Sequence, residues 1–100
     1  MAFSKTHVPL RLAQYDREQL VSRSQARRVL ARFDRFAEAL LDFNGVNFIG
    51  QAFADEIFRV FAKKHPEIKI VPINACRQVQ QMIEMAQDPA SHLQLQMFGK

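Results

Sequence analysis

Apolar and polar residues alternate along this chain with two distinct periods, and the first of them is typical of a strand. Val8, Leu10 and Leu12 alternate with other residues, as in a strand with one buried face. Pro9 has no N–H group to donate to a neighbouring strand. The pattern predicts a strand at the edge of a sheet, preceded by a loose end at residues 1–6.

A helical period follows and predicts a helix over residues 23–36. Ser22 and Gln25 have the spacing of a capping box, in which each side chain binds the other residue's free backbone N–H. Apolar residues then recur at the i, i+3, i+4 and i+7 positions of one face, namely Ala26, Val29, Leu30 and Phe33. Arginines take much of the remaining circumference of this helix.

The middle of the chain predicts a strand, a turn and a second helix. The apolar run 39–43 is typical of a strand covered on both faces, as in parallel sheets. Asn44-Gly45 indicates a turn, and the helical period resumes over 51–64. We expect four charged side chains of this helix to face water: Asp55, Glu56, Arg59 and Lys63.

A third strand and helix close the pattern. Residues 68–73 predict a strand, Asn74 is a candidate N-cap, and the helix after it should end at Asp88-Pro89. Apolar and polar residues alternate once more at 92–98, which favours a fourth strand or a tail that pairs with another copy of the chain.

Three strand–helix repeats predict an α/β fold with three helices and a mainly parallel sheet of about four strands. We interpret 1–100 as a single domain with loose or edge-pairing tails at 1–6 and 90–100. No run approaches the roughly 18 apolar residues of a membrane span. Cys76 is the only cysteine and can form no internal disulfide. We therefore expect a cytoplasmic protein without membrane contact, and a homodimer through its tail is one hypothesis.

The net charge of +4 favours an acidic partner, either nucleic acid or an acidic protein surface. Much of this charge belongs to the first helix, at Arg23, Arg27, Arg28, Arg32 and Arg35. These arginines could form a solvated face, contact phosphates, or pair with Asp42, Asp55 or Glu56. Nine of the ten aromatic residues are phenylalanines, which we interpret as core residues rather than as stacking platforms for nucleic acid.

The residues that usually form catalytic or metal sites are sparse. The three glycines, at 45, 50 and 99, cannot form a phosphate-binding loop. The three histidines are scattered without metal-ligand spacing. Asp42, Asp55 and Glu56 could form an acid cluster, but loop capping and ion pairing explain them more simply. We expect no catalytic residue, no metal and no cofactor, and we interpret Cys76 as structural.

The runs SRSQARRVL (22–30), LDFNGVNFIGQAFADEIFRVF (41–61) and HPEIKIVPINA closely resemble a bacterial STAS-like family of unassigned function. Its broader relatives are anti-sigma-factor antagonists and the STAS domains of sulfate transporters. The resemblance implies an α/β sandwich in which the loop and helix after a central strand bind a partner kinase or anti-sigma factor. In the antagonists a phosphorylated serine opens that helix, whereas the matching positions here are Gly50, Gln51 and Ala52.

The leading hypothesis is therefore a non-enzymatic regulatory domain that binds a protein. A kinase-like ATPase, an anti-sigma-type protein or a DNA-binding regulator is the expected partner. The predicted binding residues are Asn44, Gly45, Asn47, Gly50, Gln51 and Asp55, with Arg23 and Arg27. The alternative is a nucleic-acid-binding accessory protein that uses the five arginines. A small-molecule or nucleotide sensor at Gly50-Gln51 is a third hypothesis.

Overall fold

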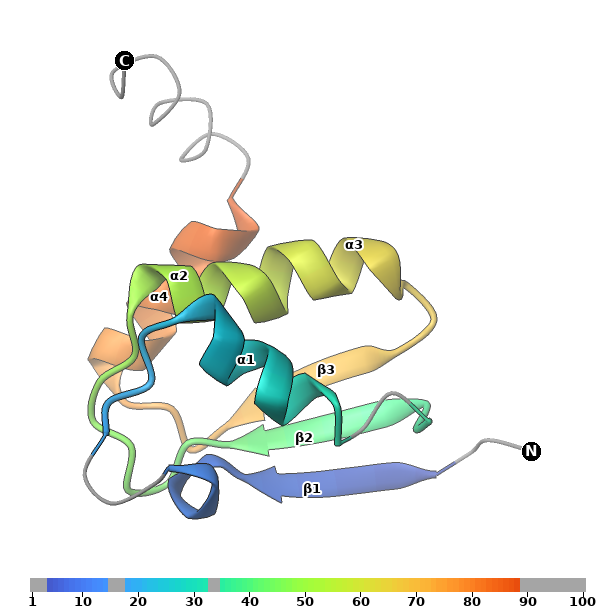
Figure 1. Ribbon diagram of the computed structural model, residues 1–100, viewed down its shortest axis with the longest axis horizontal. Coiled ribbons are helices and arrows are strands. Elements are labelled where there is room, and N and C mark those ends of the chain that lie inside the picture. The colour runs from blue at the N-terminus through green and yellow to red at the C-terminus, as the bar shows by residue number, and fades with distance from the viewer. Residues whose placement is uncertain (1–3, 15–17, 33–34, 89–100) are drawn as a thin grey trace.

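The computed structural model describes residues 4–14, 18–32 and 35–88. Three strands, β1 (Lys5–Pro9), β2 (Glu38–Asp42) and β3 (Lys69–Ile73), pair in parallel in the order β1-β2-β3. All three carboxyl ends lie at one side of the sheet (Figure 1). The predicted α/β fold with a parallel sheet is confirmed, and β1 with Pro9 is an edge strand as expected.

The helices form one layer on a single face of the sheet (Figure 1). They are α1 (Arg23–Leu30), a continuous middle helix made of α2 (Gln51–Asp55), the π-helical segment η2 (Glu56–Phe61) and α3 (Ala62–Lys64), and α4 (Arg77–Gln87). The middle helix contacts α1 and α4. None of the helices in these ranges combines the length and apolar character that a membrane crossing requires.

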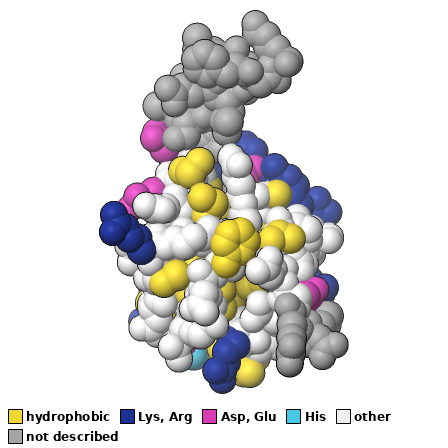
Figure 2. Space-filling model, turned by 90° about the vertical axis from the view of Figure 1, so that its left-hand side faces the viewer, with side chains coloured by type: hydrophobic (Ala, Val, Ile, Leu, Met, Phe, Trp, Pro, Cys, Tyr) yellow, Lys and Arg dark blue, Asp and Glu magenta, His cyan; other side chains and the backbone are white. Residues whose placement is uncertain are grey.

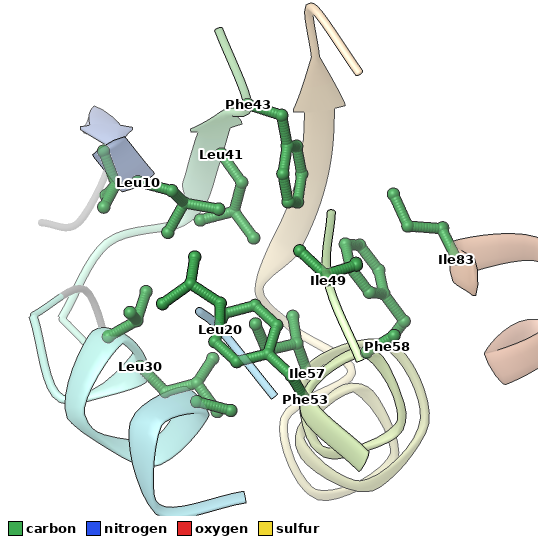
Figure 3. Packing of buried hydrophobic residues seen from close by; sticks show 14 of the residues in the cluster. Leu10, Leu20, Leu30, Leu41, Phe43, Ile49, Phe53, Ile57, Phe58 and Ile83 are labelled. Carbon is green, nitrogen blue, oxygen red and sulfur yellow. The ribbon is translucent and has the colours of Figure 1, made fainter. Parts of the chain in front are cut away.

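The core fills the space between the sheet and the helices (Figure 3). On β2, Ala39 and Leu41 are fully buried, while Leu40 between them is only partly buried. The prediction that this strand is covered on both faces is therefore wrong, because all the helices lie on one face. Phe53 and Ile57 of the middle helix pack into the core without any exposed surface. Truncating such a side chain to alanine costs roughly 2–5 kcal/mol.

The first strand differs from its prediction at both ends. It begins at Lys5, inside the segment expected to be loose, and ends at Pro9. Leu10 and Leu12 then belong to a short 3-10 helix, η1 (Leu10–Ala13), in which Leu10 is buried and Leu12 exposed. Their alternation arises from a turn over the end of the sheet rather than from a strand.

Two helix boundaries also differ from expectation. Helix α1 ends at Leu30, short of the predicted 36, and Phe33 lies outside the described residues. Cys76, not Asn74, is the N-cap of α4. Asn74 has a positive φ of 56°, which places it in a turn before the helix. The predicted fourth strand at 92–98 also lies outside the described residues.

Candidate functional site

A loop at the carboxyl end of the sheet, residues 43–50, leads from β2 into α2. Asn44 and Gly45 form the predicted turn, in which the Val46 N–H donates to the Phe43 carbonyl at 2.9 Å. Gly45 has a φ of +82°, a conformation that favours glycine. The Asn44 N–H donates to Asp42 Oδ1 at 2.9 Å, which fixes the start of the loop.

The far end of this loop is held from both sides. The Gly50 N–H donates to the Leu20 carbonyl at 2.8 Å, and Leu20 forms a parallel bridge with Ile49. On the other side, the Gln78 amide of α4 accepts from the Ile49 N–H and donates to the Ile49 carbonyl, both at 3.1 Å. The backbone before α2 is therefore fixed by two segments that are distant in sequence.

Gly50 is required here by close approach rather than by its φ. A Cβ atom at this position would lie 2.9 Å from the Cα of Val21. Because that neighbour is backbone, it could give way only if the Leu20–Ile49 bridge opened. The glycine thus brings residues 20–21 against the start of α2.

The loop holds one aromatic side chain in solvent. Phe48 is 41% exposed, although Ile49 beside it is fully buried. Val21, next to Gly50, is 42% exposed, and Leu12 on η1 is 70% exposed. Figure 2 faces this end of the molecule and shows hydrophobic side chains gathered over its centre. Several exposed apolar side chains gathered on one face are typical of an interaction surface, whereas a single one is ordinary.

We call this surface the carboxyl-end face and define it by eight residues: Leu12, Val21, Asn44, Gly45, Asn47, Phe48, Gly50 and Gln51. Five of them were predicted as binding residues from the sequence. Of these, four are exposed and Gly50 is half-buried. Leu12, Val21 and Phe48 were missed, Phe48 because phenylalanines were interpreted as core residues. The pair Phe48-Ile49 carried a signal, because adjacent residues in an extended loop point to opposite sides.

Asp55, predicted as a flanking contact, is buried instead. It is 4% exposed and accepts hydrogen bonds from Arg59 Nη2 at 2.7 Å and from Arg23 Nη1 at 2.8 Å. The Arg59 hydrogen bonds, followed by that of Arg23, hold the pKa of Asp55 below its ordinary value despite its burial. Asp55 therefore fixes two arginines and does not offer a contact to a partner.

Glu56 joins the same ion-pair network. Its carboxylate lies 3.3 Å from Arg23 Nη1 and 3.5 Å from Arg27 Nε. The prediction that Asp55 and Glu56 face water is wrong, because α1 and α4 flank the middle helix and cover that side. The alternative that the α1 arginines pair with these two carboxylates is confirmed for Arg23 and Arg27.

A shallow pocket of about 320 Å³ opens above this network, between α1, α2 and α4. Arg23, Asp55 and Arg59 line it, together with Gln51 and Met85. Its volume lies at the lower limit for small-molecule sites. The pocket joins Arg23 of α1 to Gln51 of the carboxyl-end face.

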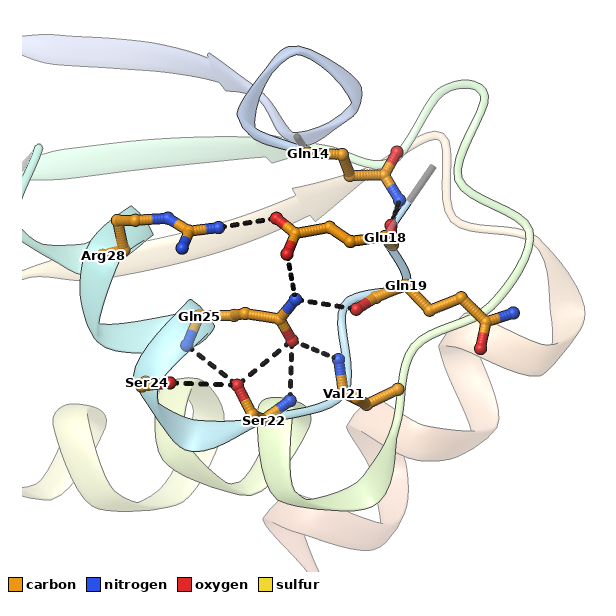
Figure 4. Close-up of polar contacts among 8 residues, drawn as sticks. All are labelled: Gln14, Glu18, Gln19, Val21, Ser22, Ser24, Gln25 and Arg28. Atoms are coloured by element: carbon orange, nitrogen blue, oxygen red, sulfur yellow. Dashed lines mark hydrogen bonds and ion pairs between the residues drawn. The ribbon is translucent and has the colours of Figure 1, made fainter. Parts of the chain in front are cut away.

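Helix α1 begins in a polar network that occupies a further arginine (Figure 4). The Gln25 amide accepts from the Ser22 N–H at 2.8 Å and donates to Glu18 at 2.9 Å, which confirms the predicted capping box. Glu18 in turn accepts from Arg28 Nη2 at 2.8 Å. Of the five arginines in the nucleic-acid alternative, three are thus paired. Arg32 and Arg35 are exposed and form no ion pair with a described residue.

Asp42 lies apart from this network, on the face of the sheet that carries no helix. It pairs with His7 Nε2 at 2.8 Å and accepts from the Asn74 amide at 3.0 Å. The hydrogen bonds from Asn74, from the Asn44 N–H and from His7 lower the pKa of Asp42 to about 2. Asp42 and Asp55 therefore have separate partners. No group of three metal-ligating side chains occurs in the part of the chain that the structure describes.

A comparison with protein families places residues 25–80 in a STAS-like domain of unknown function, DUF4325. No curated protein and no solved structure matches the chain significantly. The matched residues run from the capping box of α1, through the loop at 43–50, to the first turn of α4, and so include most of the carboxyl-end face. The chain therefore belongs to this family of STAS-like domains.

Proposed function

We propose that this domain is a non-enzymatic regulatory module that binds another protein through its carboxyl-end face. One observation carries the proposal: Phe48 is exposed on a loop whose backbone is fixed by Leu20 and Gln78. Aromatic side chains near the centre of a surface are frequent hot spots of protein interfaces.

The free energy of burying Phe48 in an interface supports this binding role. Burying a phenylalanine side chain contributes roughly 1.5–3 kcal/mol. Because the loop is already ordered in the free protein, a partner would not need to fix its backbone, and less of that free energy would be lost on binding. Asn44, Asn47 and Gln51, exposed and close to Phe48 in sequence, supply polar groups of the kind that an interface rim needs.

The resemblance to anti-sigma-factor antagonists supports the same location, since it implies binding by the loop and helix after a central strand. Here that strand is β2, the middle strand of the sheet, and that helix is α2. Gly50 is the N-cap of α2 and Gln51 its first residue, so neither position carries a hydroxyl. We therefore propose that binding at this face does not depend on phosphorylation at the start of α2. A kinase-like ATPase, an anti-sigma-type protein or a DNA-binding regulator is the proposed kind of partner.

The first prediction tests this face directly. Immobilised wild-type protein and its Phe48→Asp, Gln51→Arg and Phe48→Leu variants are incubated with nuclease-treated lysate of the source organism, and bound proteins are compared by mass spectrometry. We expect a stoichiometric protein that wild type and Phe48→Leu retain and that the other two variants lose, because a charge at either position opposes apolar burial.

Circular dichroism and thermal melting provide the control for folding, since Phe48 and Gln51 are both exposed. Equal recovery of the same proteins by all four variants would exclude the carboxyl-end face. If untreated lysate yields only nucleic acid, and moderate salt abolishes its recovery, Arg32 and Arg35 on the α1 side become the better candidates.

A further inference from the structure

We infer that the partner offers an acidic surface with an apolar centre, because the carboxyl-end face is bordered by two arginines that form no ion pair with any carboxylate the structure describes. This inference rests on the proposed function and specifies the chemistry of the partner. The two residues are Arg11 on η1 and Arg77 at the start of α4. Neither was among the binding residues predicted from the sequence.

Arg11 lies directly against the turn of the loop. A Cβ atom built on Gly45 would be 2.7 Å from Arg11 Cδ and 3.5 Å from its Nη1. The guanidinium group is therefore beside Gly45, at the border of the face, and the residue is exposed. It forms no ion pair with any residue in the described ranges.

Arg77 borders the loop from the other side. It follows Cys76, whose Sγ lies 3.5 Å from the Asn47 carbonyl, and it precedes Gln78, which holds Ile49. The residues on either side of Arg77 therefore contact the loop on which Phe48 is exposed. Arg77 is also exposed and has no ion pair within the described part of the chain. Figure 2 shows basic side chains at the border of the apolar centre.

Asp42, next to the loop, and Glu18, close to Val21 in sequence, are already engaged. Asp42 accepts from the Asn44 N–H and Asn74 and pairs with His7. Glu18, close to Val21 in sequence, binds Arg28 and Gln25. Arg23 and Arg59, by contrast with Arg11 and Arg77, are each bound to Asp55. Within the described part of the chain, the charges of Arg11 and Arg77 are therefore not compensated by an ion pair.

Such an arrangement favours a partner with carboxylates placed around an apolar group. Phe48 and Val21 would contact that group, while Arg11 and Arg77 would bind the carboxylates. Charges at the border of an interface act mainly on the association rate and on the choice of partner, and salt screens them. A neutral or basic partner would gain the apolar contact without this contribution.

Random peptides displayed on phage provide a defined probe. Peptides are selected on the full-length wild-type protein, and those that still bind the Phe48→Asp variant are removed. The remaining peptides are tested against a double variant, Arg11→Glu with Arg77→Glu. The matched control is Lys63→Glu with Lys64→Glu, which changes the net charge equally at exposed positions of α3. Arg11→Gln with Arg77→Gln removes the charge without reversing it.

We expect the Phe48-dependent peptides to be rich in Asp and Glu next to apolar residues. Their affinity should fall about tenfold or more in the Arg11/Arg77 charge reversal at low salt, and less at high salt. The Arg11→Gln/Arg77→Gln variant should lose less affinity for the peptides than the charge reversal does. The Lys63→Glu/Lys64→Glu control should bind them like wild type.

Two results would overturn the inference, and they differ in what they mean for the proposed function. Phe48-dependent peptides that are neutral or basic, and that bind the charge-reversed variant as well as wild type, would exclude an acidic partner but leave the face intact. If no Phe48-dependent peptide is recovered, both the acidic partner and the proposed binding face are contradicted.

Discussion

Phe48 and Ile49 are neighbours in the chain with opposite environments, and this contrast underlies the proposed function. Ile49 is fully buried, and both of its backbone polar groups bind the Gln78 side chain. That anchorage leaves Phe48 on the solvent side. A pattern of apolar residues cannot distinguish the two, because both are large, apolar and adjacent.

The charge state of Asp42 makes the free energy of unfolding depend on pH. Hydrogen bonds from Asn74, Asn44 and His7 lower its pKa from the ordinary value of 3.8 to about 2. Since the folded state binds the proton more weakly than the unfolded state, the charged carboxylate stabilises the fold above the ordinary pKa. This contribution is lost as the pH falls toward the lowered pKa.

We predict that Asp42→Asn lowers the free energy of unfolding at neutral pH. The difference from wild type should shrink as the pH falls from about 4 to about 2, where Asp42 itself becomes protonated. Urea unfolding at a series of pH values measures this difference. Glu84→Gln, an exposed change on α4, is the control. A difference that grows toward low pH would contradict the assignment of the lowered pKa.

At the scale of elements, the loop depends on helix α4 for its shape. Gln78 supplies one acceptor and one donor to Ile49, and Cys76 approaches the carbonyl groups of Val46 and Asn47. Helix α4 therefore acts as a scaffold for the loop, although the two are separated by the whole middle helix and β3.

The next prediction tests this scaffold. Gln78→Ala leaves the buried Ile49 N–H and carbonyl without partners, and an unsatisfied buried polar group costs about 1–3 kcal/mol. We expect a loss of stability in that range and faster amide hydrogen exchange at Ile49. Gln81→Ala, an exposed change on the same helix, is the matched control. Unchanged exchange at Ile49 in the Gln78 variant would mean that α4 does not hold the loop.

The order of elements could be predicted from the sequence, whereas their mutual contacts could not. The capping box at Ser22 and Gln25 and the turn at Asn44-Gly45 are local signals, and the structure confirms both. Asp55 and Glu56 were misjudged, because their burial depends on α1 and α4, which periodicity along the middle helix does not reveal. Arg11 was missed as a site residue for the same reason, since its contact with Gly45 is tertiary.

At the scale of the whole molecule, two surfaces of different character are separated by the fold. The carboxyl-end face lies where the strands end and α2 begins. It carries exposed apolar groups and is bordered by Arg11 and Arg77, which form no ion pair with a described residue. The α1 side carries more arginines, but Glu18, Asp55 and Glu56 bind three of them. This distribution makes the carboxyl-end face the stronger candidate for protein binding. The two surfaces can be tested separately by mutation.

NMR mapping of the contact surface would show where the partner binds on the domain. Isotope-labelled domain is titrated with the protein that wild type, but not Phe48→Asp, retains. We expect the largest chemical-shift changes at residues 44–51, at Val21 and at Arg77. Changes confined to the exposed α1 arginines, or to the sheet face that carries Asp42, would contradict binding at the carboxyl-end face.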